Sequence, residues 1–101
     1  MPKIYEYFGI MIFFYSREHE PIHVHGRYGN NESKAEFIIK DGKIIEIKIK
    51  SVSDIKPLKD KDLRNFNQFL KVYADQIVGK WIDFFVFKRK VSFERITKKL
   101  K

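Results

Sequence analysis

The chain contains no cysteine, and this absence excludes disulfide frameworks and thiolate zinc sites. A reducing compartment is the natural setting for such a sequence, so we expect a cytoplasmic protein. Proline and glycine are also scarce, with three and five residues, and no repeat or low-complexity linker interrupts the sequence. The 101 residues therefore predict a single domain over 1–101, with one hydrophobic core.

Long apolar runs are missing as well. The most apolar stretch is "FGIMIFFY", which is too short for a membrane span. Glu6 precedes it and no small-residue cleavage site follows it, so it does not resemble a signal peptide. We interpret it as a buried strand and expect no membrane partner.

Acidic residues are few in the second part of the chain. Residues 1–57 hold nine Lys or Arg and eight Asp or Glu, whereas residues 58–101 hold twelve and five. A basic segment favours polyanions through counterion release, so nucleic acid is a candidate partner. The alternative is an ordinary solvated surface. The candidate nucleic-acid-binding residues are Lys88, Arg89, Lys90, Lys98 and Lys99.

The first half of the chain predicts β-strands. Residues 3–15 are rich in β-branched and aromatic side chains around Gly9, so we expect one bent strand or two short ones. Residues 22–28 alternate between apolar and polar, and "GNN" at 29–31 is typical of a turn. The next strand is expected at 32–40, with alternate apolar residues on one face.

The sequence "KDGK" after that strand allows two hairpin loops. A two-residue loop at 41–42 would place Phe37 opposite Glu46 and mix the faces of the sheet. A three-residue loop at 40–42 places Phe37 opposite Ile45, so that the apolar faces coincide. We therefore predict the three-residue loop.

A helical period begins near Leu58, and Asp60 and Asp62 suit the first turn of a helix. Gly79 is expected to bend or end this helix, and residues 90–96 predict a short late strand or arm. The predicted fold class is α+β: a curved antiparallel sheet of about four strands, packed against one long C-terminal helix. The apolar residues with helical spacing are Leu63, Phe66, Leu70, Tyr73, Ile77, Trp81 and Phe84.

All three histidines lie in the short stretch "HEPIHVHGR", at His19, His23 and His25. Strand alternation places His23, His25 and Arg27 on one face, away from the core, where we expect them to be exposed to solvent. The turn at Pro21 is expected to fold His19 toward them.

Three interpretations of this row stay open. His23 and His25 can bind one zinc or iron ion with a third ligand. Alternatively, the imidazoles perform acid–base chemistry on a phosphodiester that Arg27 holds. The third interpretation is structural, with the rings solvated or hydrogen-bonded to the loop. The candidate third metal ligands are His19, Glu18, Glu20 and Glu36.

The opening "MPKIYEYFGIMIFFYS", followed by "HEPIHVHGRYG", resembles the small bacterial family called domain of unknown function 4160. The resemblance covers residues 1–29 closely and the whole chain loosely, whereas residues 83–101 depart from the family pattern. The matching motif and helix residues are His19, Pro21, His23, His25, Lys80 and Trp81.

The resemblance implies a function only indirectly, because the family is uncharacterised. Its members are often encoded beside another short protein, in arrangements that look like toxin–antitoxin or mobile-element pairs. This association implies a toxin–antitoxin-like or defence-associated module that binds nucleic acid or a small protein encoded nearby. The alternative is a histidine-dependent nuclease or metal-dependent hydrolase that uses His19, His23, His25 and Arg27.

Overall fold

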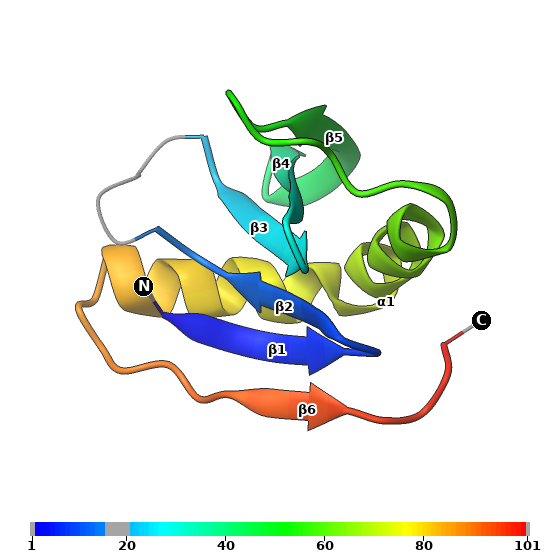
Figure 1. Cartoon of the computed structure of the whole chain (residues 1–101). Helices are drawn as coiled ribbons and strands as arrows, with labels where there is room; N and C mark the ends of the chain where they lie inside the picture. The colour runs from blue at the N-terminus through cyan, green and yellow to red at the C-terminus, as the bar shows by residue number, and fades with distance from the viewer. Residues whose placement is uncertain (1, 16–20, 101) are drawn as a thin grey trace.

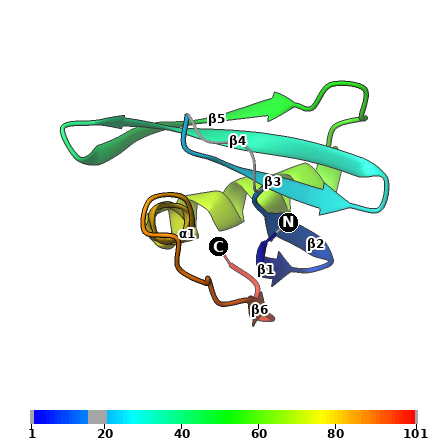
Figure 2. The same ribbon diagram turned by 90° about the vertical axis from the view of Figure 1, so that its left-hand side faces the viewer.

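One long helix lies across one face of a six-stranded mixed sheet (Figures 1 and 2). The computed structural model describes residues 2–15 and 21–100. The α+β class with one long C-terminal helix is confirmed. In chain order the elements are β1 Lys3–Tyr7, β2 Ile10–Phe13, β3 His23–Tyr28, β4 Asn31–Lys40, β5 Lys43–Ser51, α1 Asp60–Phe85 and β6 Glu94–Ile96.

The expected sheet of about four antiparallel strands is wrong in number and in one strand direction. Residues 3–15 form two strands, because Phe8 and Gly9 make a tight turn with φ of 46° and 83°. The predicted late strand is present as β6, but it pairs parallel with β1, and the sheet order is β5-β4-β3-β2-β1-β6. Local patterning carries no signal for pairing between the two ends of a chain, so only the tertiary structure reveals this neighbour.

The loop between β4 and β5 has two residues, and our prediction of three was wrong. Asp41 and Gly42 have φ of 52° and 76°, as a type I′ hairpin turn requires. A bulge beside the turn, at Ile45 of β5, then shifts the register, so Phe37 lies opposite Ile47. The apolar faces of β4 and β5 coincide, as expected. The bulge produces this alignment, whereas we had expected a longer loop to do so.

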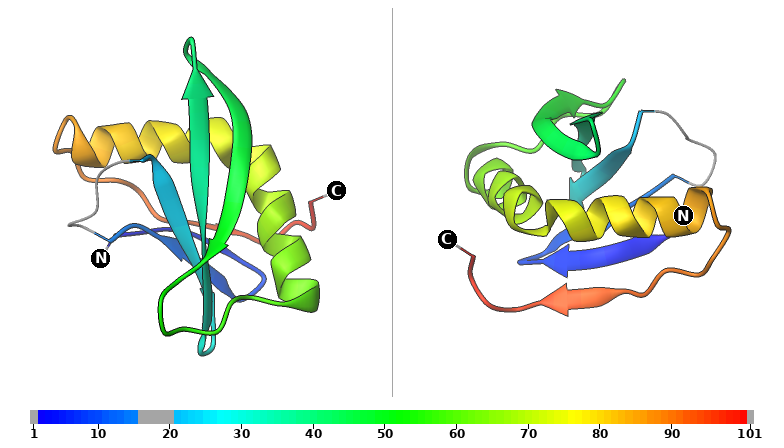
Figure 3. Two further views of the ribbon diagram at one scale, coloured as in Figure 1. Left: turned by 90° about the horizontal axis from the view of Figure 1, so that it is seen from above. Right: turned by 180° about the vertical axis from the view of Figure 1, so that it is seen from behind.

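α1 packs its apolar side against β1, β3 and β5, and its path changes direction part-way along (Figure 3). The non-helical residue at this kink is Tyr73, with φ of −105° and ψ of 15°. Gly79, which we expected to bend or end the helix, lies within it. Among the described residues, no helix is long and apolar enough to cross a membrane. The buried apolar residues of α1 include four of the predicted set and are Phe66, Phe69, Leu70, Ile77, Trp81 and Phe85.

α1 approaches β3 closely at Gly26, because a Cβ there would overlap the ring of Phe66. Phe66 is fully buried and has little room to move, so Gly26→Ala should lower the free energy of unfolding by about 1–3 kcal/mol. Urea denaturation measures this change, and Phe66→Leu in the same chain should recover part of it. Gly79→Ala is the matched control: a Cβ there meets nothing within 4 Å, so it should stabilise the helix by about 0.5–1 kcal/mol.

Candidate functional site

The row of His23, His25 and Arg27 lies on the sheet face that points away from α1, as the alternation predicted. Gly26, between the last two, contacts Phe66 of the helix, so its neighbours point to the opposite side. The centroids of the two imidazole rings are 5.3 Å apart. The strand therefore brings both histidines into one site.

The histidines are buried, so the expectation that they are exposed to solvent was wrong. His23 is 8% exposed and His25 is 2% exposed. Phe13 stacks on the His25 ring with centroids 5.5 Å apart, and Tyr15 meets that ring edge-on at 4.4 Å. Alternation along a strand determines on which face a side chain lies, but not which residues cover it. Here Phe13, at the end of β2, and Tyr15, two residues later, cover the His25 imidazole.

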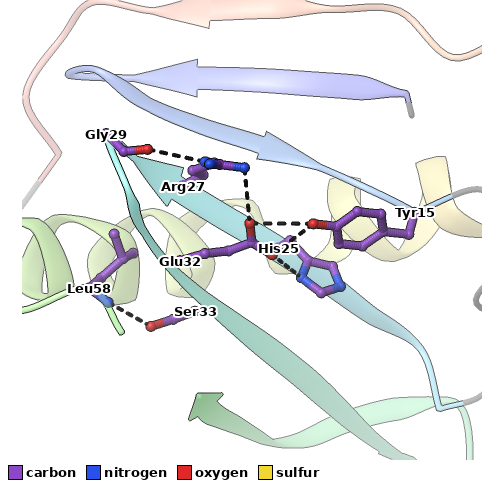
Figure 4. Close-up of polar contacts among 7 residues, drawn as sticks. All are labelled: Tyr15, His25, Arg27, Gly29, Glu32, Ser33 and Leu58. Carbon is purple, nitrogen blue, oxygen red and sulfur yellow. Dashed lines mark hydrogen bonds and ion pairs between the residues drawn. The ribbon is translucent and has the colours of Figure 1, made fainter. Parts of the chain in front are cut away.

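The carboxyl group of Glu32 on β4 holds this site together (Figure 4). Its side chain is 0% exposed. The Tyr15 hydroxyl donates to Oε2 at 3.1 Å, and Nδ1 of His25 lies 3.1 Å from the same oxygen. Nη1 of Arg27 lies 3.8 Å from Oε1. A buried carboxylate requires such partners because its desolvation is costly, and we call these four residues the Glu32 network.

Glu32 was missed as a site residue in the sequence. A turn at 29–31 was expected, but the turn has two residues and places Arg27 directly opposite Glu32. The alternation of β4 does contain the signal. Ala35 faces the core, so Glu32, three residues earlier, must face the histidines.

His23 and His25 each contact another group of the protein through the ring nitrogen Nδ1. Nδ1 of His23 lies 2.7 Å from the carbonyl oxygen of Pro21, which can only accept, so this nitrogen carries the proton. This contact supports the structural interpretation, in which a histidine is hydrogen-bonded to the loop at Pro21. Nδ1 of His25 faces Glu32, and an imidazole oriented by a carboxylate occurs both in acid–base sites and behind metal ligands.

The metal site stays a prediction. His19 lies outside the described residues, as do Glu18 and Glu20. Among the residues that the structure describes, no group of three or more His, Cys, Asp or Glu side chains is arranged to hold a metal ion. Glu36 lies opposite His23, but its carboxylate is 2.8 Å from the ammonium of Lys50. That hydrogen bond lowers the pKa of Glu36 below its usual value.

The predicted nucleic-acid-binding residues fall into two groups at opposite ends of the molecule (Figure 1). Residues 88–90 follow the end of α1, and Arg89 pairs there with Asp83 at 3.6 Å. Lys98 and Lys99 follow β6, near the start of the helix, where Lys99 donates a hydrogen bond to Asn65. The five residues do not form one surface.

Most of the chain, including the site, matches the model of a known sequence family. The model of the domain of unknown function family DUF4160 matches residues 9–82, more than half of the chain. This chain belongs to the DUF4160 family. The DUF4160 match contains β2 to β5, hence both described histidines and Glu32, and it ends before β6. No curated protein and no solved structure matches this DUF4160 protein significantly.

Proposed function

We propose that this DUF4160 protein is a small toxin–antitoxin-like or defence-associated module that binds nucleic acid. The toxin–antitoxin-like setting rests on the family resemblance. The binding rests on one observation, a groove along the first half of α1 that is rich in cations and amides. We call it the α1 groove, and its lining residues are Lys61, Arg64, Asn65, Asn67, Gln68, Lys71 and Lys99.

The α1 groove has the chemistry of a phosphate-binding surface. Lys61, Arg64 and Lys71 recur at helical spacing, so they form one stripe along the helix. Lys99 is added from the C-terminal segment, where Asn65 accepts its hydrogen bond. Among the described residues that line this groove there is no carboxylate, whereas Lys and Arg are the usual partners of phosphate oxygens.

Salt dependence tests the proposal. With about 0.7–0.9 counterions released per phosphate contact, four contacts predict that affinity falls roughly 50- to 150-fold between about 50 and 200 mM salt. The double variant Arg64→Glu/Lys71→Glu should reduce that fall to roughly 7- to 12-fold, because two contacts are lost. Fluorescence anisotropy with a labelled oligonucleotide measures both.

The matched control is Lys40→Glu/Lys43→Glu. It makes the same change in net charge on exposed residues at the β4–β5 hairpin tip, which lies at the opposite end of the sheet from the start of α1 (Figure 3). This control should retain most of the wild-type slope. Equal slopes for the two double variants, or no binding by the wild type at low salt, would exclude the α1 groove as the binding surface.

Phosphodiester cleavage is the second candidate function, and the Glu32 network favours it. In this mechanism His25 takes the proton of an attacking hydroxyl group, whose oxygen bonds to phosphorus, while Glu32 stabilises the imidazolium. His23 gives a proton to the departing oxygen, and Arg27, which is 44% exposed, pairs with the phosphate. Tyr15 must move for a substrate to reach His25, because its ring packs edge-on against the imidazole.

A further inference from the structure

The α1 groove continues into a second hollow that carries two aromatic rings. This hollow is lined by Phe8 and Tyr28, and it shares three lining residues, Lys61, Asn65 and Lys99, with the α1 groove. Phe8 and Tyr28 are each 45% exposed, so part of each ring is open to solvent beside the groove. Asp62 is the acidic member of the lining.

Phe8 occupies a backbone position that a phenylalanine rarely adopts. Its φ is 46° and that of Gly9 is 83°, so both central residues of the β1–β2 turn are left-handed. Such turns favour Asn-Gly, because Asn tolerates positive φ whereas a bulky side chain is strained there. Strained residues of this kind cluster at functional sites, so the exposed ring is a candidate for a binding role.

The two rings are held in place by their surroundings. Tyr28 packs against Gly9 so closely that a Cβ on that glycine would lie 2.6 Å from its ring. The Phe8 ring meets Tyr7 edge-on with centroids 4.8 Å apart, and the ammonium of Lys99 lies 5.2 Å from its centroid. The hairpin tip is therefore an aromatic platform beside a cation that belongs to the groove.

We propose that this platform, formed by Phe8 and Tyr28, stacks the bases of a single-stranded nucleic acid whose phosphates lie in the α1 groove. Exposed aromatic faces beside a positively charged groove are the recurring design of single-strand binding, because every unpaired base offers a flat face. A duplex keeps its bases stacked on one another and cannot use the platform. The inference rests on the proposed nucleic-acid binding and adds the class of ligand.

Phe8→Asn is the decisive variant, because Asn suits the turn and removes the ring. Its melting temperature should equal or exceed that of the wild type, whereas its affinity for single-stranded DNA should fall about 5- to 150-fold. The probe is a short fluorescein-labelled DNA strand of mixed sequence, which lacks the 2′-hydroxyl and so resists cleavage through that group. Phe93→Asn is the matched control, since Phe93 is also 45% exposed, and it should bind as the wild type does.

The outcomes separate this inference from the proposed function. If Phe8→Asn binds normally while Arg64→Glu/Lys71→Glu binds weakly, the platform is excluded and the groove stands. If the corresponding duplex binds as tightly as the single strand, the single-strand specificity is excluded. If the wild type binds neither strand nor duplex, both proposals fail.

Discussion

Replacing Glu32 with alanine should lower the free energy of unfolding by about 3–5 kcal/mol, the usual loss when one partner of a buried charged pair is removed. The Glu32 side chain is 0% exposed and accepts from the Tyr15 hydroxyl, with His25 and Arg27 beside it. The variant removes a shared acceptor from the Tyr15 hydroxyl and the buried His25 imidazole, and a buried donor that loses its acceptor costs about 1–3 kcal/mol. Small domains have only about 5–15 kcal/mol in total, so the variant should lose a substantial part of its stability.

Urea denaturation followed by circular dichroism measures this loss. Glu32→Gln keeps the shape and one carbonyl acceptor, so it should be less destabilised than Glu32→Ala. Glu46→Ala is the matched control, because Glu46 is exposed and its replacement should change stability by no more than about 0.5 kcal/mol. A Glu32→Ala midpoint that matches this control would contradict the view that the carboxyl group organises the site.

If the second candidate function is correct, His25→Asn should reduce phosphodiester cleavage by about 100- to 10,000-fold, the usual contribution of a general acid or base. The Asn amide nitrogen can replace Nδ1 as the donor to Glu32, so the network keeps a hydrogen bond while the titratable nitrogen is lost. The assay follows cleavage of a labelled RNA strand, with and without a metal chelator. Loss of activity in chelator would favour the metal-dependent hydrolase over the metal-free nuclease.

A control must separate lost chemistry from lost stability, because His25 is buried. Leu70→Ala serves this purpose: Leu70 is fully buried in the core, so its truncation should cost about 2–5 kcal/mol without touching the imidazoles. Measured well below its melting temperature, this variant should cleave at a rate close to that of the wild type. If it loses activity as His25→Asn does, the loss reflects folding, and the histidines are structural. Absence of cleavage by the wild type would leave nucleic-acid binding as the remaining proposal.

Alanine variants of the two histidines do not by themselves show whether the row is a working site, because neither imidazole is exposed to solvent. His23 and His25 are 8% and 2% exposed. Truncation of either ring should therefore affect stability even if the ring has a chemical role. Only a variant that keeps the hydrogen bond, such as His25→Asn, distinguishes the two roles.

The sequence by itself determined the features that depend on local periodicity. Alternation along residues 22–28 put His23, His25 and Arg27 on one face, because successive strand side chains point to opposite sides. Steps of three and four residues beyond Leu58 predicted the helix and most of its buried side, including Phe66 and Leu70. The motif around the histidines also pointed to the DUF4160 family.

Only the tertiary structure decided the features that depend on loop lengths and on distant contacts. The two-residue turn between β3 and β4 set the register that placed Glu32 beside His25, and the aromatic rings of Phe13 and Tyr15 cover the imidazole. The α1 groove and its platform join residues from the helix, the two β-hairpin ends and the C-terminal segment. Periodicity acts over a few residues, whereas these sites depend on which distant segments the core brings together, and that is a property of the whole fold.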